Sequence, residues 1–420
     1  MVRRIVSDYY ETTREFSPNA RLFLFATFLS WIGMSVNQVV FNLYLVSAGY
    51  GEEFVGGVTS MGGAGMAAMA LPAGYLADRF GRRACLLWGS AAIALMLGVR
   101  ALSLSPQALF ASTFLLGSGQ AIVTIASSPF MSENSSESER THLFSMHFVV
   151  VLLGGLVGNL LGGELPGFLE RHATAWAASP LLAFRATLVA GAAASLLALL
   201  PLPGVDEAPR VREAPHERIR GRDHLGLLSR LAVNYLLLGM GAGLVMPFFN
   251  LYFAQRFGAS PSQIGLYFSV AQVLTLVATL IGPLIAGRVG KLNALTVLQL
   301  LSLPFLVTLG FEKHLELAVL AFWIRSALMQ MSSPLLNSLA MDFVPPALRA
   351  RAVGLDNLGW YIGWAVSSAL AGWVIQNFGY EYPYYLTAVF YGLATVTFYF
   401  NFRSLAASKR RTPAPEPEAA

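Results

Sequence analysis

The chain has 420 residues, of which 55% are hydrophobic and only 12% are charged. A soluble protein carries roughly twice that charged fraction, so the composition excludes an ordinary soluble domain and favours several membrane-spanning segments. The net charge of +5 is accompanied by six scattered histidines and a single cysteine, Cys85, which excludes an internal disulfide. The sequence contains no metal-ligand cluster and no phosphate-binding glycine loop followed by Lys-Ser/Thr. We therefore expect no enzyme activity, no metal and no cofactor.

A helix that crosses a bilayer needs about 20 apolar residues. The sequence predicts twelve such spans, at residues 20–48, 52–77, 84–104, 107–131, 141–170, 178–203, 228–256, 262–286, 292–313, 315–340, 350–377 and 381–403. The stretch before residue 20 is polar and charged, and no small-residue cleavage site follows it, so no signal peptide is expected. The predicted fold class is an all-α integral membrane protein with twelve transmembrane helices.

Basic residues fall unevenly on the loops between these spans. With both termini inside, 22 of the 28 Lys and Arg residues lie on the inner side, and four, including Arg100, lie in outer loops. The remaining two, Arg185 and Arg325, lie within spans. The positive-inside rule predicts a multi-pass protein of the inner (cytoplasmic) membrane with both termini cytoplasmic. Because these arginines face an anionic leaflet, the net charge indicates the lipid bilayer as a partner, and no nucleic acid.

The most informative segment is a charged decapeptide, G-Y-L-A-D-R-F-G-R-R, at residues 74–83 between the second and third spans. Ionised groups are costly near hydrocarbon unless they pair or reach water. The residues that carry the pattern are Gly74, Asp78, Arg79, Gly81, Arg82 and Arg83. The two glycines permit close helix approach and a sharp turn. The string resembles the signature loop between helices 2 and 3 of the major facilitator superfamily (MFS) of secondary transporters.

The two halves of the chain repeat each other. The run Asn42-Leu43-Tyr44-Leu45 recurs as Asn250-Leu251-Tyr252-Phe253, and after a one-residue shift the offset between the halves stays constant. Matched positions include Gly49 and Gly258, Gly81 and Gly290, Arg82 and Lys291, Glu133 and Asp342, and His147 and Asp356. The MFS resemblance implies two pseudo-symmetric six-helix bundles, at residues 1–203 and 228–403, with a substrate site near the midplane. Residues 204–227 are expected to form a cytoplasmic linker and residues 404–420 a disordered cytoplasmic tail.

The resemblance also implies a gating role for the charged loop. In that family the loop is held to lock one face of the transporter through charge pairs that break as the halves rock. Carried over, Asp78 and Arg82 would form the pair, with Glu133 at the inner end of the fourth span as a third member. Only the first half keeps the acid, since Gly287 stands where Asp78 would repeat. The alternative is that Asp78 caps the turn and the arginines anchor to lipid.

Polar side chains are aligned on the spans that line the substrate cavity in that family, the first and fourth of each half. In the span 20–48, Trp31, Gln38 and Asn42 share one helix face. Gln120 lies on the polar face of the span 107–131, and Asn250 is the repeat partner of Asn42. These residues are candidates for lining the cavity. The alternative is hydrogen bonding between helices.

Three ionisable residues inside the predicted spans are candidates for a functional role. Arg325 lies near the middle of the span 315–340, where an arginine marks a functional site by default, unless it pairs with a carboxylate of another helix. His147 and Asp356 are candidates for proton coupling, since both types of group can exchange a proton when partly buried. The alternatives are a core histidine and, for Asp356, a helix cap or a partner of Arg79 and Arg82.

Together these features predict a monomeric secondary transporter that moves a small organic solute by alternating access. No Asp or Glu lies mid-span in the four cavity helices, so a neutral, amphiphilic or anionic solute is favoured over a cation. Proton-coupled export (efflux by an antiporter) is the leading mode. The glycines of the segment 154–163 match the spacing of a motif of MFS exporters, with Asn159 in place of its proline. A facilitator or importer of a neutral solute such as a sugar, and a transport-inactive sensor or scaffold, are the alternatives.

Overall fold

The computed structural model describes residues 16–172, 179–206 and 224–411. All regular structure in these ranges is helical. The first half contains α2 (Pro18–Ser47), α3 (Glu52–Met69), α4 (Pro72–Phe80), α5 (Arg82–Leu102), α6 (Pro106–Glu133), α7 (Glu137–His172) and α8 (Pro180–Leu197). The second half contains α9 (Leu225–Val245), α10 (Phe249–Leu251), α11 (Pro261–Val289), α12 (Lys291–Phe311), α13 (Leu315–Phe343), α14 (Arg349–Phe378) and α15 (Glu381–Arg411).

Serine followed by proline begins four of these helices. The pairs are Ser17-Pro18, Ser105-Pro106, Ser179-Pro180 and Ser260-Pro261. Proline suits the first helical position because the N–H that it lacks would have no intrahelical partner there. At α11 the Ser260 hydroxyl accepts a hydrogen bond from the Gln263 N–H at 3.3 Å, and the Gln263 amide oxygen accepts one from the Ser260 N–H at 2.9 Å. This reciprocal capping box fixes the start of the helix.

Ten helices among the described residues are long and apolar enough to cross a membrane, and the bent pair α3–α4 makes an eleventh if it is one span. α15, the twelfth predicted span, has 31 residues and is not among these helices, since its tyrosines and threonines make it less apolar. The prediction of an all-helical membrane protein is confirmed. The second predicted span is not a straight helix, since α3 and α4 meet at 55°. Pro72 begins α4 and lacks the N–H that would continue the hydrogen-bond ladder of α3.

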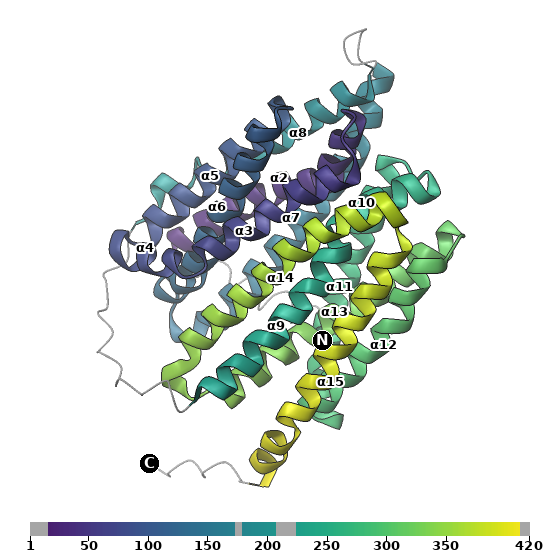
Figure 1. The fold of residues 1–420 in the computed structure, drawn as a ribbon. Coiled ribbons are helices and arrows are strands. Elements are labelled where there is room, and N and C mark those ends of the chain that lie inside the picture. Colours follow the sequence, from purple (N-terminus) through teal and green to yellow (C-terminus); the bar gives the residue numbers. More distant parts are fainter. Residues whose placement is uncertain (1–15, 173–178, 207–223, 412–420) are drawn as a thin grey trace, which may run out of the picture.

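Figure 1 shows two bundles, α2–α8 in purple to teal and α9–α15 in green to yellow. The bundles meet where α3 packs against α14, α7 against α11, and α2 against α10. We call the end of the molecule that carries the turns at Gly81 and Gly290 the basic end. The basic residues at these turns are Arg79, Arg82, Arg83, Arg288 and Lys291. The other end, with the turns at Gly49 and Gly258, is the opposite end.

At the opposite end the two halves touch through glycines. A Cβ added to Gly56 on α3 would lie 2.8 Å from the Cα of Gly372 on α14. A Cβ added to Gly163 on α7 would lie 3.1 Å from the Cα of Gly265 on α11. The two contacts are related by the repeat, because Gly56 matches Gly265 and Gly163 matches Gly372. Since only glycine permits such close backbone approach, these contacts pack the halves together at this end.

The one-residue shift in the repeat lies within a single helical turn. Tyr44 and Tyr252 match at an offset of 208 (252 − 44), and Gly49 and Gly258 match at 209 (258 − 49). Between these positions, Tyr252–Arg256 forms a π-helical turn, which contains one more residue than an α turn. Both glycines then adopt a positive φ, 92° at Gly49 and 67° at Gly258. The inserted residue is therefore absorbed in the wider turn.

Helices extend into both segments that the sequence assigned to the linker and the tail. α9 begins at Leu225, before the predicted start of its span at residue 228. α15 continues to Arg411, past the predicted start of the tail at residue 404, because no glycine or proline interrupts the helix before Pro413. Residues 207–223 of the predicted linker and residues 412–420 of the predicted tail lie outside the described residues.

Candidate transport cavity and charge cluster

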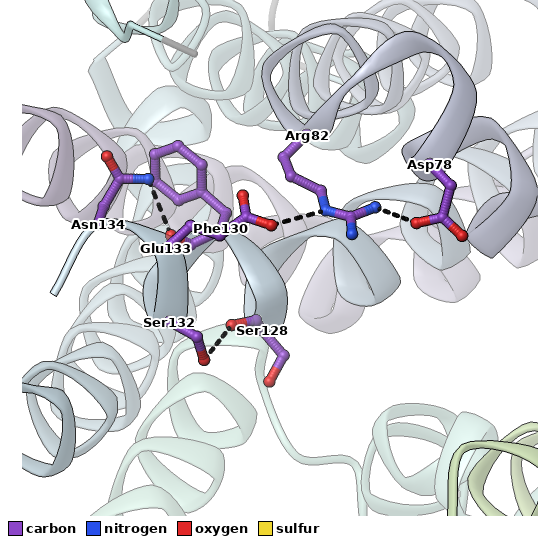
Figure 2. Close-up of polar contacts among 7 residues, drawn as sticks. All are labelled: Asp78, Arg82, Ser128, Phe130, Ser132, Glu133 and Asn134. Carbon is purple, nitrogen blue, oxygen red and sulfur yellow. Dashed lines mark hydrogen bonds and ion pairs between the residues drawn. The ribbon is translucent and has the colours of Figure 1, made fainter. Parts of the chain in front are cut away.

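Arg82 connects two acids at the basic end (Figure 2). Its Nη1 donates to Asp78 Oδ1 of α4 at 2.7 Å, and its Nε donates to Glu133 Oε1 of α6 at 3.4 Å. Gly81 makes this arrangement possible, because its φ of 97° turns the chain from α4 into α5 within one residue. We call Asp78, Arg82 and Glu133 the Arg82 cluster. The structure thus brings together the three residues that the sequence analysis grouped.

The second half carries a matching contact between a basic and an acidic residue. Lys291 Nζ lies 2.7 Å from Asp342 Oδ2 and donates to Ser338 Oγ at 2.8 Å. Lys291 is the repeat partner of Arg82, and Asp342 is the repeat partner of Glu133. Each half therefore links the start of its third long helix to the end of its fourth. The position of Asp78 is occupied by Gly287, so the two halves differ here by one carboxylate.

The other two arginines of the charged loop have hydrogen-bond partners outside the Arg82 cluster. Arg79 Nη1 donates to the Tyr75 hydroxyl at 2.9 Å, and Arg83 Nη2 donates to the Pro203 carbonyl at 2.6 Å. Gly74 does not make the close helix contact that the sequence predicted, since an added Cβ would meet nothing within 4 Å. The reason is that α4 buries the face formed by Ala73 and Ala77, and Gly74 lies beside that face.

A cavity with two lobes lies between the halves. The first-half lobe has a volume of about 380 Å³ and is lined by α2, α3, α5, α6 and α14. The second-half lobe has a volume of about 360 Å³ and is lined mainly by α9 to α13. Gln38, Met246 and Trp360 line both lobes, so the lobes are adjacent. Asn337, near the basic-end terminus of α13, also lines the second-half lobe, so the cavity reaches toward the basic end.

Most of the polar residues predicted on the cavity helices lie in the cavity wall. Trp31, Gln38, Asn42 and Gln120 line the first-half lobe. Asn250, in contrast, does not line either lobe, so the prediction that it lines the cavity is corrected. It is 1% exposed, donates to the Val39 carbonyl at 3.0 Å and accepts from Asn42 Nδ2 at 3.2 Å. The alternative reading, hydrogen bonding between helices, applies to Asn250 because its side chain faces α2 instead of the cavity.

Arg325, a predicted cavity residue, lies in the wall of the second-half lobe. Its side chain donates from Nη2 to the Tyr391 hydroxyl at 3.2 Å, and its Cζ lies 5.7 Å from the ring centroid of Phe249. The residue is 3% exposed, and its Nε is buried with no hydrogen-bond partner. The alternative of a buried ion pair is not observed, since no carboxylate pairs with Arg325 within residues 16–172, 179–206 and 224–411.

Arg100 is a second buried arginine in the cavity wall, which the sequence analysis placed in an outer loop. It lies inside α5 and is 6% exposed, and its Cζ stands 3.5 Å from the ring centroid of Phe41. It lines the first-half lobe, and its Nε is buried without a hydrogen-bond partner. The available signal was that the apolar residues Ala101 and Leu102 follow it, so the helix continues beyond the arginine.

The two proton-coupling candidates have different surroundings. Asp356 is 4% exposed, its Oδ1 has no hydrogen-bond partner, and it forms no ion pair in the part of the chain that the structure describes. It lies well inside α14, which begins at Arg349, so it does not cap the helix. Its carboxylate is close enough to interact electrostatically with Tyr235, which lines the second-half lobe. The His147 ring stacks on Phe23 with the ring centroids 5.5 Å apart, as expected of a core histidine.

Comparisons with known proteins agree with this architecture. The arabinose-proton symporter of Bacillus subtilis is 23% identical over 75% of this chain and 76% of its own length. The cis,cis-muconate transport protein of Acinetobacter baylyi is 25% identical over 41% of this chain and 42% of its own length. In fold, the chain resembles a bacterial homologue of the human lysosomal transporter Spinster in an inward-facing, unoccupied conformation. That likeness has a TM-score of 0.77 at 16% identity and covers 94% of this chain and 98% of the other.

The family model described as Major Facilitator Superfamily matches residues 23–229 and 231–420, which is nearly the whole chain. The match agrees with the all-helical fold, with the paired halves and with the charged loop at Gly81. The chain therefore belongs to the major facilitator superfamily, a family of secondary transporters of small solutes and not of enzymes.

Proposed function

We propose that this protein carries a small organic solute through the two-lobed cavity by alternating access and that the movement is coupled to protons. The observation that carries the proposal is the position of the cavity between pseudo-symmetric halves that are packed together at one end by glycines. A solute in such a cavity crosses when the halves rock and the packed end opens. The Arg82 cluster, at the other end, joins α4, α5 and α6 of the first half, and its proposed role is to hold these helix ends in the arrangement that closes that end in the alternate state.

The proposed orientation places the basic end in the cytoplasm. The turns at that end carry the arginines and lysine named above, and such residues are enriched on the cytoplasmic side of membrane proteins. In this orientation both termini are cytoplasmic, the protein lies in the inner membrane, and the cavity reaches toward the cytoplasm.

Asp356 is the proposed proton carrier. Carboxylates inside membrane-spanning segments act as proton relays in transporters, and Asp356 is buried without a hydrogen-bond partner on Oδ1. Tyr235 links the surroundings of Asp356 to the second-half lobe. The Tyr235 hydroxyl donates to Asn337 Oδ1 at 2.7 Å, and both residues line that lobe. His147 lacks this relation to the cavity, because its ring packs against Phe23 in the first half.

The relatives support proton coupling more directly than they support export. The named arabinose transporter is a proton symporter, whereas the glycines that suggested an exporter have a packing role in this chain. A Cβ added to Gly154 would lie 2.7 Å from the Phe28 carbonyl, and one added to Gly158 would lie 2.4 Å from the Ile32 carbonyl. Antiport and symport differ in the direction of proton movement relative to the solute, so the sign of the internal pH change on solute addition distinguishes them.

The test uses proteoliposomes that contain the full chain and an internal pH indicator, to which neutral, anionic and cationic solutes are added in turn. We expect a solute-dependent change of internal pH in the wild type. In Asp356→Asn we expect the pH change to be lost while labelled solute still equilibrates, because the amide cannot carry the proton. His147→Gln is the matched control at the repeat-related position and should keep the pH change. A normal pH change in Asp356→Asn would contradict the proposed carrier.

A further inference from the structure

The two buried arginines occupy corresponding surroundings in the two halves. Arg100 stands over the ring of Phe41 at 3.5 Å, and Arg325 lies 5.7 Å from the ring centroid of Phe249. These phenylalanines are repeat partners, because their offset of 208 (249 − 41) equals that of the two matched tyrosines. The arginines themselves are not repeat partners, since they come from different helices, α5 and α13. In each half, an arginine side chain therefore lies beside the same aromatic position of the repeat.

Both guanidinium groups lie close to the junction between the halves. Asn42, which follows Phe41, donates from Nδ2 to Asn250 Oδ1 at 3.2 Å, and Asn250 follows Phe249. The arginines thus flank one contact between the halves, with Arg100 in the first-half lobe and Arg325 in the second-half lobe.

The depth of the two arginines is also similar. Arg100 is 18 residues from the basic-end terminus of α5 (100 − 82), and Arg325 is 18 residues from that of α13 (343 − 325). This spacing corresponds to about 27 Å of helix in both cases. Both cations therefore lie at the deep side of a cavity that reaches toward the basic end.

No carboxylate of the described residues forms an ion pair with either cation. Each residue is more than nine-tenths buried, at 6% and 3% exposure, and each has a buried Nε without a hydrogen-bond partner. No Asp or Glu lines either lobe within the described residues, and Arg325 has only the Tyr391 hydroxyl as a hydrogen-bond partner there. Burying a cation without a partner is costly, so the site is complementary to negative charge that arrives with a ligand.

We propose that the transported solute is an organic dianion, with one anionic group bound by Arg100 and the other by Arg325. The inference rests on the proposed transport function and names the substrate class of the same cavity. A monoanion would neutralise one arginine and leave the other unpaired, and a neutral solute would leave both unpaired. A carboxylate fits the planar guanidinium with two parallel hydrogen bonds. Trp31, Trp360 and Phe322 in the cavity wall suit an apolar segment between the two anionic groups.

Binding is tested on the purified full-length protein by titration of its tryptophan fluorescence, since Trp31 and Trp360 line the cavity. The probes are the dicarboxylates glutarate, adipate and suberate, with hexanoate and 1,6-hexanediol as matched compounds that carry one charge and no charge. We expect the best dicarboxylate to bind at least about tenfold more tightly than hexanoate. Arg100→Gln and Arg325→Gln should each remove that preference, because one anionic group then has no partner.

Arg185→Gln is the matched control, since Arg185 donates to the Tyr44 hydroxyl at 3.2 Å and lines neither lobe. This variant should keep the preference for dicarboxylates. Arg100→Lys and Arg325→Lys retain the charge and should keep part of the preference. Thermal unfolding of every variant separates loss of binding from loss of the fold. Equal affinity for dicarboxylates and hexanoate in the folded wild type, or no binding of any dicarboxylate, would overturn the proposal.

The binding assay tests the dianion site and the transport assay tests the transport function, so either proposal can be contradicted without the other. Tight dicarboxylate binding without flux in proteoliposomes would remove the transport function and keep the dianion site. Flux of neutral solutes without a dicarboxylate preference would keep the transport function and remove the dianion site.

Discussion

Arg82 and Arg325 are both arginines of membrane-spanning helices, and their surroundings differ in exposure and in partners. The Arg82 side chain is 22% exposed and bonds to Asp78, whose side chain is 72% exposed. Arg325 is 3% exposed and lies in a lobe that has aromatic residues in its wall. No Asp or Glu of the described residues lines that lobe. Exposed ion pairs contribute about 0–1 kcal/mol to stability, so the Arg82 cluster adds little to the free energy of unfolding. The proposed role of the cluster is to stabilise one of the two alternating conformations.

Asp78→Asn tests this view of the Arg82 cluster. We expect the variant to change the free energy of unfolding by less than about 1 kcal/mol, because the lost pair is exposed. We expect it to lower the initial transport rate by about tenfold, since one of the two alternating states loses its lock. The measurements are thermal unfolding of the purified protein and solute flux in proteoliposomes.

Asp342→Asn is the matched control in the second half, where Lys291 pairs with one acid among the described residues and Arg82 pairs with two. Its effect on flux should be smaller than that of Asp78→Asn. Normal flux in Asp78→Asn would remove the proposed lock.

At the scale of helices, the glycine contacts at the opposite end are the elements that must separate for transport. Each contact joins a helix of the first half to a helix of the second, and each is too close for any larger residue to fit without a shift of the backbone. The repeat relation between the two contacts means that this end has the same packing on both sides of the pseudo-symmetry axis. A single added methyl group should therefore act directly on the equilibrium between the two states.

Gly163→Ala is predicted to favour the state that is open at the opposite end. The added Cβ would lie 2.8 Å from the Pro261 carbonyl oxygen, so the packed state becomes strained. Gln38→Cys in a Cys85→Ser background places one thiol in the cavity wall. Labelling of this thiol by an impermeant maleimide from the side of the opposite end should increase severalfold.

Gly167→Ala is the control on the same helix, because its added Cβ would meet nothing within 4 Å. It should leave the labelling unchanged. An identical labelling rate in Gly163→Ala and Gly167→Ala would contradict the role of the glycine contact.

Much of the fold could be predicted from the sequence because a helix in lipid must be apolar along its whole length, and such runs are visible in composition alone. The bend at Pro72 was not predicted, since the apolar run continues through it. Arg100 was assigned to a loop although two apolar residues follow it and continue the helix. Asn250 was assigned to the cavity for a different reason: whether a side chain faces a cavity or a neighbouring helix depends on the rotation of its helix, which hydrophobicity does not report when all faces are apolar.

For the whole molecule, the two halves form one transporter only if their basic ends lie on the same side of the membrane. The predicted orientation places that side, and the C-terminus, in the cytoplasm. A reporter that is active only in the cytoplasm, fused after residue 420, should therefore be active in cells. A reporter that is active only outside, fused at the same point, should be silent. The reverse pattern would invert the orientation and turn the cavity toward the exterior.

The π-helical turn at Tyr252–Arg256 explains how the pseudo-symmetry survives a change in chain length. An extra residue in a regular α-helix would rotate every later position by about 100° and would turn cavity-facing side chains toward lipid. Because the wider turn holds the additional residue, Tyr252 at its start still donates to a carbonyl in the third long helix of its own half, as Tyr44 does in the first half. The glycine after it still makes the same bend. In genetic terms, this turn is a site at which a duplicated membrane protein can gain or lose a codon while all downstream positions keep their counterparts.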